Sequence, residues 1–150
     1  MAHHLAQFNI ARAIAPLDDP RLADFIARLD EINKLAEASP GFVWRFTAPG
    51  GQSSTYVQAS DDPRMLVNLS VWASVEALRD FAYRSSHAEL LRARRRWFEP
   101  AQGPTLAMWW LPAGALPTLD ESKARLAVLA ERGPTPDAFT FRQSFPAPSG

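Results

Sequence analysis

The chain has 150 residues, a length typical of a single domain that can bury a sizeable core. The absence of Cys excludes disulfides, thiolate metal sites and a Cys nucleophile. Sixteen basic and sixteen acidic residues give a formal net charge of +0, which disfavours a strongly basic nucleic-acid binder and an acidic tail protein.

The composition and the N-terminus bound the class of protein further. A hydrophobic content of 47% excludes general disorder, and 13 Pro indicate short elements separated by many turns. The N-terminus, MAHHLAQFNIARA, has no basic segment followed by a long apolar run, and no stretch contains 18 uninterrupted apolar residues. We therefore expect a cytoplasmic protein that partners neither a membrane nor a nucleic acid.

The first half of the chain reads as strand, helix, strand and strand. Pro20 suits the first turn of a helix that Asp18 or Asp19 caps, and Pro40 ends this helix. Between the two prolines apolar residues recur three and four positions apart, as in an amphipathic helix. Strands are expected at residues 5–13, 42–47 and 65–72.

The second half begins with two helical segments. Ser74 can cap a helix that runs to Tyr83. Ser86 and Glu89 form a capping box that opens a further helix towards Trp97.

The chain then continues through a strand and a third capped helix. Thr118 and Glu121 form a second capping box, and Gly133 followed by Pro134 ends the helix that this box opens. Strands are expected at residues 105–111 and 138–143, and the tail over 146–150 is expected to be loose.

The order of the first six elements, β-α-β-β-α-β, is that of the ferredoxin-like split βαβ fold. We predict one α+β domain over residues 1–150, with a mostly antiparallel sheet, helices on one face and an added C-terminal helix. The other face of such a sheet needs a cover, which a second copy of the chain can supply. We therefore predict a homodimer that buries sheet against sheet.

Alternation along the predicted strands separates two sets of side chains. The set expected to pack against the helices on residues 65–72 is apolar: Met65, Val67, Leu69 and Val71. The set expected on the open face is richer in polar groups: Gln7, Asn9, Asn68, Ser70 and Trp72, with Trp109 or Trp110. On residues 42–47 the pattern leaves open which set faces inwards: Phe42, Trp44 and Phe46, or Val43, Arg45 and Thr47.

Polar groups held among large aromatic side chains are typical of a small-molecule pocket. A dimer interface also favours Trp and polar partners, so a pocket and an interface remain alternatives for the open face.

Motifs along nearly the whole chain resemble one family of bacterial proteins. They are PGFVWRF (40–46), NLSVW (68–72), His87, WF (97–98), MWWLP (108–112), LPT (116–118), GPTP (133–136) and AFTF (138–141). In this order they resemble the domain of unknown function 3291 family. That family is similar in fold to the dimeric α/β-barrel superfamily of antibiotic-biosynthesis monooxygenases.

The resemblance implies a ferredoxin-like, dimeric α/β barrel. Proteins of this superfamily include cofactor-free oxygenases, isomerases, haem enzymes and proteins without known chemistry. The family supplies no catalytic residue to carry over to this chain, so the site has to be argued from its own residues.

Three residues are candidates for chemistry. His87 is expected in the first turn of a helix, where it can act as a general acid/base, as an axial haem ligand or as a structural capping residue. In a cofactor-free oxygenase of the fold that the resemblance implies, Asn, Trp and His steady a substrate enolate. Asn68 is therefore a candidate polarising residue, and Arg45 is a second one that can also hold an anionic ligand.

The remaining candidates would bind substrate: Trp44, Trp72, Trp109, Asn9 and Gln7. No second His or carboxylate stands at ligand spacing from His87, so no metal site is expected. The leading hypothesis is a protein that binds or transforms a small molecule, as a cofactor-free monooxygenase or isomerase on an aromatic or polyketide-like substrate. The alternatives are a haem-binding protein with His87 as axial ligand and a non-catalytic ligand-binding or scaffold module.

Overall fold

A computed structural model describes residues 2–47, 62, 64–84, 96–100 and 103–148. Its sheet contains β1 (His3–Arg12), β2 (Phe42–Arg45), β3 (Met65–Trp72) and β4 (Leu106–Pro112) in the order β2-β3-β1-β4. In this order β3 lies between β2 and β1, and β1 lies between β3 and β4. Each neighbouring pair is antiparallel. This is the ferredoxin-like split βαβ arrangement that the element order predicts.

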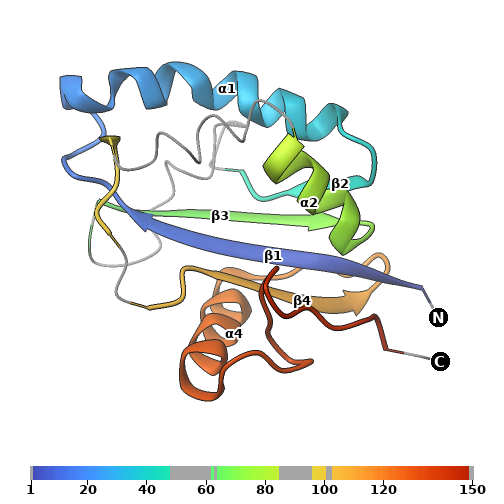
Figure 1. Ribbon diagram of the computed structural model, residues 1–150. Coiled ribbons are helices and arrows are strands. Elements are labelled where there is room, and N and C mark those ends of the chain that lie inside the picture. Colours follow the sequence, from blue (N-terminus) through green and yellow to red (C-terminus); the bar gives the residue numbers. More distant parts are fainter. Residues whose placement is uncertain (1, 48–61, 63, 85–95, 101–102, 149–150) are drawn as a thin grey trace.

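Within the described ranges, three α-helices connect or extend this sheet: α1 (Ala23–Ala38), α2 (Val75–Arg84) and α4 (Leu119–Arg132), with a 3-10 turn η1 (Pro20–Leu22) before α1. Figure 1 shows α1 and α2 on one face of the sheet and α4 on the other. In the described part of the chain no helix is both long and apolar enough to cross a membrane.

Local capping explains where the 3-10 turn η1 and the helices α2 and α4 begin. The Asp19 carboxylate accepts a hydrogen bond from the Arg21 backbone N–H at 2.9 Å, and the Thr118 hydroxyl accepts one from the Glu121 N–H at 3.1 Å. The Ser74 hydroxyl accepts one from the Ala77 N–H at 3.1 Å. These side chains satisfy N–H groups that lack a partner in the first turn of a helix, and all three caps were expected from the sequence.

After residue 84, one predicted element lies outside the described residues and another differs from the structure. The helix expected from Ser86 lies outside the described residues up to residue 95. The strand expected over 138–143 is wrong: Phe139 forms one antiparallel bridge with Met108, through hydrogen bonds of 2.8 and 2.9 Å. The chain then crosses towards α2 rather than following β4, because the next aromatic residue, Phe141, packs against Tyr83 at a centroid distance of 5.5 Å.

The apolar set of side chains faces α4. On β3 this set includes Val67, Leu69 and Val71, which are all buried. They belong to one cluster with residues of the neighbouring strands and of α4: Ala6, Phe8, Ala107, Trp109, Leu111, Leu119, Leu126, Val128 and Leu129. The expectation that this set packs beneath the two helices of the ferredoxin-like core is therefore wrong, because the C-terminal helix occupies that face.

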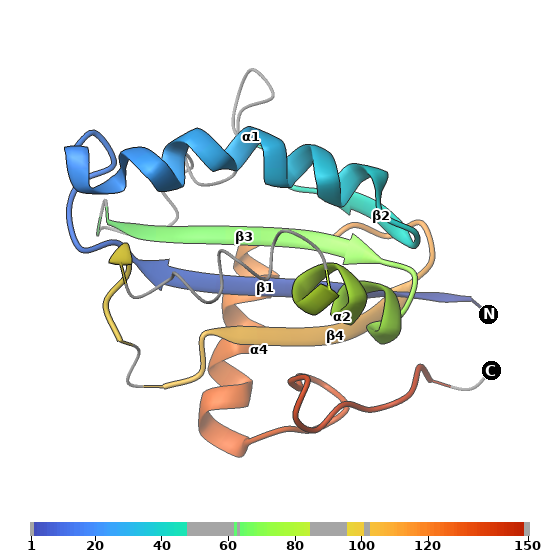
Figure 2. The same ribbon diagram turned by 45° about the horizontal axis from the view of Figure 1, so that its top comes forward.

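The polar set faces α1 and α2. On the same side as this set lie Leu5, Trp72 and Met108, which form a cluster with Ile32 of α1 and Leu78 of α2. The view in Figure 2, turned from that of Figure 1, shows both helices crossing this face. The face expected to be open is thus covered by the helices, and the opposite face is covered by α4. A homodimer stays a prediction, but the apolar side of the sheet does not depend on a second copy for its cover.

Candidate functional site

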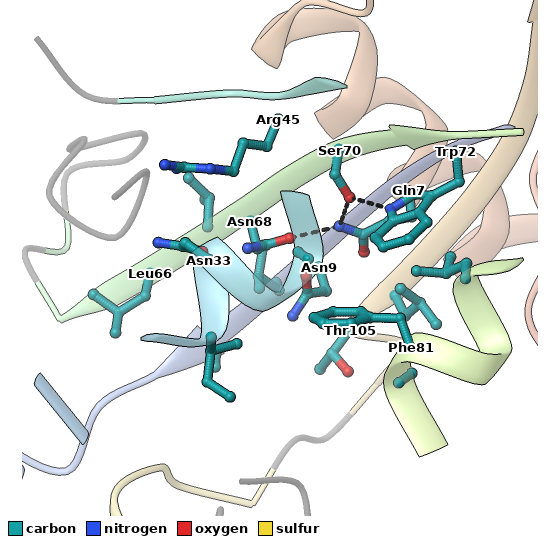
Figure 3. Close-up of a pocket in the computed structure, with 18 of the residues that line it drawn as sticks. Gln7, Asn9, Asn33, Arg45, Leu66, Asn68, Ser70, Trp72, Phe81 and Thr105 are labelled. Carbon is teal, nitrogen blue, oxygen red and sulfur yellow. Dashed lines mark hydrogen bonds between the residues drawn. The ribbon is translucent and has the colours of Figure 1, made fainter. Parts of the chain in front are cut away.

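A cavity of about 320 Å³ lies between the sheet and the helices α1 and α2 (Figure 3). This volume is within the range of pockets that hold small organic molecules. Its apolar and aromatic lining includes Phe25, Leu29, Ile32, Phe42, Leu66, Trp72, Leu78, Phe81, Phe98 and Phe141. Its polar lining is Gln7, Asn9, Asn33, Arg45, Asn68, Ser70, Tyr83 and Thr105. A few polar groups in a mostly apolar wall are the usual composition of a ligand pocket.

The strand register explains how residues far apart in the sequence meet in this cavity. Ser70 on β3 stands opposite Gln7 on β1 and opposite Arg45 on β2. Two positions along the strand, Asn68 stands opposite Asn9. Because directly opposed residues of an antiparallel pair share a face, these five side chains form a polar band across the middle of the sheet.

A β-bulge decides which residues of β2 join this band. Phe42 pairs with Trp72 and Arg45 pairs with Ser70, with the register shifting between Phe42 and Trp44. Strict alternation would place Phe42 and Arg45 on opposite faces, but the extra residue reverses the parity and brings both to the cavity. Trp44 instead packs on the α4 side. The set Phe42, Trp44 and Phe46 is therefore divided between the two faces, with Phe42 at the cavity and Trp44 and Phe46 on the α4 side.

Gly41, just before β2, allows α2 to lie close to this strand. Its φ is +83°, and a Cβ built on it would stand 2.5 Å from the Cβ of Ala77 in α2. Its carbonyl accepts a hydrogen bond from the Ala73 N–H at 2.7 Å. Gly is therefore required here both for the backbone conformation and for the close approach of α2, which carries Leu78 and Phe81 into the cavity wall.

A hydrogen-bonded network holds part of the polar band in place. The Gln7 Nε2 donates to Asn68 Oδ1 at 2.6 Å and to Ser70 Oγ at 2.8 Å, and Trp72 Nε1 donates to the same Ser70 oxygen at 2.9 Å. Gln7, Ser70 and Trp72 are buried, whereas Asn68 is exposed to the cavity. With Asn68 Oδ1 bonded to Gln7, the Asn68 amide nitrogen is the group left to donate to a ligand.

Arg45 is the single charged residue in the described lining of the cavity. Its side chain is 18% exposed, and its Nε lies 3.8 Å from Glu37 Oε1, too far for a hydrogen bond. The Nε is buried and has no hydrogen-bond acceptor. Figure 3 shows the guanidinium extending over the same end of the cavity as the Asn33 and Asn68 amides.

The structure brings together five of the eight residues expected at the site from the sequence: Gln7, Asn9, Arg45, Asn68 and Trp72. Trp44 and Trp109 belong to the cluster on the α4 face and do not line the cavity. His87 lies outside the described residues. The roles of all eight in binding or catalysis remain predictions.

Several lining residues were missed by sequence reasoning because they come from helices or from the C-terminal segment. Asn33 was missed although it follows Ile32 in the middle of the apolar stripe of α1, a polar interruption that is a usable signal. Phe81 and Phe141 had no such signal. Phe81 stacks on Trp72 at 5.2 Å, and Phe141 reaches the cavity only because its chain crosses back to α2.

The described residues were also assessed for metals and haem. Across the described ranges no three His, Cys, Asp or Glu side chains gather as metal ligands. Of the residue types that bind haem iron, the described lining contains only Tyr83, which is 55% exposed. The described residues therefore do not fit a haem pocket, and the haem hypothesis rests on His87 alone.

Comparison with known proteins connects this fold to others. The family described as "Domain of unknown function (DUF3291)" matches residues 4–150. A search of curated proteins found no significant match. Among solved structures, NE2512, a protein of unknown function from Nitrosomonas europaea, has a TM-score of 0.51 at 19% identity and covers 77% of this chain and 96% of its own.

Two further solved structures are similar at lower scores. SnoaB, a cofactor-independent oxygenase from Streptomyces nogalater, has a TM-score of 0.49 at 18% identity, with 78% of this chain and 100% of its own covered. PA3566 from Pseudomonas aeruginosa has a TM-score of 0.49 at 13% identity, with 77% and 98% covered. Of these three structures, NE2512 alone has a TM-score above 0.5, so its likeness is the one that bears on this chain. At 19% identity it supports the fold alone.

Proposed function

Since the chain belongs to the DUF3291 family, whose description assigns no activity, we infer its function from the cavity and propose that it is a cofactor-independent oxygenase. Its substrate would be a planar aromatic molecule with an enolisable carbonyl or a phenol. The observation that carries this proposal is the polar band of amide, hydroxyl and guanidinium groups across an otherwise apolar cavity of about 320 Å³.

The apolar part of the cavity supports the choice of an aromatic ligand. Trp72 stacks on Phe81 at a centroid distance of 5.2 Å and meets Phe42 edge to face at 5.4 Å. Aromatic walls of this kind contact flat rings over a large area at a low cost in conformational entropy.

The polar band supports stabilisation of an oxyanion. The Asn68 amide nitrogen and the Arg45 guanidinium are N–H donors without a hydrogen-bond acceptor in the described structure. Donors that the fold holds in fixed positions stabilise charge that develops on an oxygen better than freely reorienting water does. An enolate or phenolate oxygen placed in this band would receive that stabilisation.

The proposed reaction draws its electrons from the substrate. Loss of a proton from a methylene carbon conjugated with the carbonyl, as in anthrone, gives the enolate. The enolate transfers electrons to molecular oxygen, a carbon–oxygen bond forms at that carbon, and the resulting peroxide anion takes up the proton to give a hydroperoxide. Loss of water then leaves a new carbonyl, so that each methylene group and one molecule of oxygen give one carbonyl group and one molecule of water. No flavin, haem or metal is needed as a source of electrons.

The described lining residues can stabilise the substrate enolate, but they include no evident base that would remove the substrate proton. None of them carries a carboxylate or an imidazole. His87 stays a prediction for the acid/base role. A substrate whose proton is already acidic, such as a tricyclic ketone with an aromatic enol, needs the least help from a protein base.

Oxygen uptake with anthrone, a planar tricyclic ketone, tests the proposal. We expect the purified protein, with no added cofactor, to consume one molecule of oxygen for each anthraquinone formed, faster than the protein-free solution. Asn68→Ala removes the amide donor and should lower the rate by roughly 10²-fold. Saturable binding without oxygen uptake above the protein-free rate would show that the protein is not an oxygenase.

A pair of Trp variants serves as the matched control. Trp72→Phe changes the wall of the cavity and should weaken anthrone binding, measured by quenching of Trp fluorescence. Trp44→Phe changes the opposite face of the sheet and should leave both binding and rate unchanged. If anthrone does not bind at all, or if Trp44→Phe is the variant that weakens binding, the assignment of this cavity is wrong.

A further inference from the structure

We propose that the substrate is an aromatic carboxylic acid whose carboxylate binds Arg45 at the end of the cavity formed by β2 and α1. This inference rests on the proposed function, because it names the class of ligand for the same cavity. It concerns binding and does not depend on whether oxygenation takes place.

The charge of the cavity is the first argument. Arg45 carries the single formal charge of the described lining, and no Asp or Glu is among those residues. A guanidinium in a mostly apolar cavity attracts an anion more strongly than one at the surface, because little water screens the two charges. A neutral or cationic ligand would leave this charge with Glu37, 3.8 Å from the Arg45 Nε, as its counterion in the described structure.

The incomplete bonding of Arg45 is the second argument. The Glu37 carboxylate forms a long ion pair with Arg45, at 3.8 Å between Arg45 Nε and Glu37 Oε1, and the Glu37 side chain is 49% exposed. The buried Nε has no acceptor, and a buried donor without a partner costs free energy. A structural Arg normally has its donors satisfied, as Arg12 does with hydrogen bonds of 2.6 Å to Asp62 and to Glu99. Arg45 is therefore placed for a ligand rather than for a partner within the chain.

The neighbours of Arg45 complete a site of the right chemistry. The Asn33 amide from α1 and the Asn68 amide from β3 lie at the same end of the cavity (Figure 3). A guanidinium binds a carboxylate through two parallel hydrogen bonds, and amide N–H groups can donate to the same oxygens. No Asp or Glu among the described lining residues competes with this anion for Arg45.

The opposite end of the cavity fixes the orientation of the ligand. Trp72 and Phe81 lie there, away from the Arg45 guanidinium, in Figure 3. A molecule with a carboxylate at one end and a flat ring at the other fits this gradient from charged to aromatic lining. Binding the ring at the aromatic end would direct the carboxylate to Arg45.

A matched pair of ligands tests the proposal without any mutation. We expect 2-naphthoate to bind the wild-type protein about 10- to 100-fold more tightly than 2-naphthamide, the loss expected for one hydrogen-bonded charge pair. Both ligands have the same ring, so calorimetric dissociation constants isolate the carboxylate. The preference should decline as salt is raised from about 50 to about 500 mM, because salt screens the ion pair.

Two variants of Arg45 test whether this residue causes the preference for 2-naphthoate over 2-naphthamide. Arg45→Gln should remove it by weakening naphthoate binding alone, and Arg45→Lys should keep part of it because the charge remains without the planar fork. Arg96→Gln changes an Arg that is 63% exposed and absent from the lining, and should keep the full preference. Thermal unfolding of each variant shows whether it is folded, and the wild-type ligand comparison holds even if Arg45→Gln is not.

The outcomes separate this inference from the proposed function. Equal binding of 2-naphthoate and 2-naphthamide by the wild-type protein would overturn the carboxylate assignment and leave an aromatic-binding cavity in place. A preference that survives in folded Arg45→Gln would likewise overturn the role of Arg45. If the folded wild-type protein binds neither ligand at millimolar concentration, the cavity does not bind aromatic molecules, and the proposed function is wrong.

Discussion

The two faces of the sheet differ in what surrounds them, although the same strands build both. On the α4 face, Val67, Leu69 and Val71 of β3 are each no more than 3% exposed, and they pack into a continuous apolar cluster. On the other face the alternate residues of β3 are Asn68, Ser70 and Trp72, which line a cavity beneath α1 and α2. One strand therefore contributes stability on one side and a ligand site on the other.

This difference indicates how a small domain can keep a partly polar pocket. A cavity loses dispersion contacts, and a buried polar band gains little net stability from its hydrogen bonds. The close-packed apolar face against α4 compensates for both. We therefore expect substitutions on the α4 face to change the free energy of unfolding most, and substitutions on the pocket face to change ligand binding most.

The largest effect on the free energy of unfolding is expected on the α4 face, and it is measured by comparing two adjacent residues of β3 that point to opposite faces. Leu69→Ala removes a side chain with 0% exposure from the cluster under α4 and should lower the free energy of unfolding by about 2–5 kcal/mol. Asn68→Ala, one position earlier, should cost less than about 1 kcal/mol because Asn68 faces the cavity. Urea unfolding followed by circular dichroism measures both. Similar losses from the two variants would contradict the contrast between the faces.

The next effect concerns the packing of α2 over the pocket face. Gly41→Ala adds a methyl group 2.5 Å from the Ala77 Cβ at a φ of +83°, and should destabilise the protein by roughly 2–4 kcal/mol. Gly114→Ala is the matched control, because Gly114 has a φ of +94° but nothing within 4 Å of the added methyl group. The difference between the two in thermal unfolding isolates the contact with α2. If both variants lose the same stability, this contact contributes nothing.

A smaller effect is expected at the start of α4. Thr118→Ala removes the hydroxyl that accepts the hydrogen bond from the Glu121 N–H, and should cost about 1 kcal/mol in the free energy of unfolding. Thr118→Ser retains the hydroxyl and should keep most of the stability. Neither change should alter ligand affinity, because α4 lies on the face away from the cavity. A change in affinity with Thr118→Ala would show that the two faces are coupled.

The smallest effect on the free energy of unfolding is expected from an ion pair at the end of β1. Arg12 donates hydrogen bonds of 2.6 Å to Asp62 and to Glu99, and its guanidinium holds the pKa of Asp62 below its ordinary value of 3.8. A lowered pKa means that the folded state binds the Asp62 proton less tightly than the unfolded state does. The stability from this pair is thus fully present above about pH 4 and is lost as the pH falls through the lowered pKa.

Asp62→Asn tests this sign. The wild-type protein should exceed the variant in its urea midpoint by a small, constant margin between about pH 5 and pH 7, since the pair is solvent-exposed. The margin should close between about pH 4 and pH 2. A margin that widens towards acid would mean that Asp62 has a raised pKa in the folded protein.

Much of the secondary structure follows from local chemistry that can be read along the chain. The strand expected at residues 65–72 has those bounds in the structure, and the caps at Asp19, Ser74 and Thr118 lie where short polar side chains precede apolar periodicity. Gly133, with a φ of +74°, ends α4 as expected. Caps and stops depend on residues within four positions, so a single sequence contains what is needed to place them.

The candidate site could be predicted only in part. The polar set Gln7, Asn9, Asn68 and Ser70 was recognised as a group because alternation in a strand is a local property. The match to residues 4–150 likewise confirms the family that the motifs resembled. Alternation leaves Trp109 or Trp110 for this group and leaves the face of Trp44 open, whereas the structure places Trp44 and Trp109 on the other face and Trp110 on the same side as the group. Alternation cannot place Trp44 because the bulge near it changes the register of β2.

The chain's own residues thus determine its element order, its antiparallel pairing and the division of each strand into an apolar and a polar side. Which helices cover each side is decided only by the tertiary structure, because alternation defines two faces without saying what packs on them. The C-terminal helix takes the apolar face, since burial of that face removes the most apolar surface from water. The polar face is left to α1 and α2, with space between them and the sheet for a ligand.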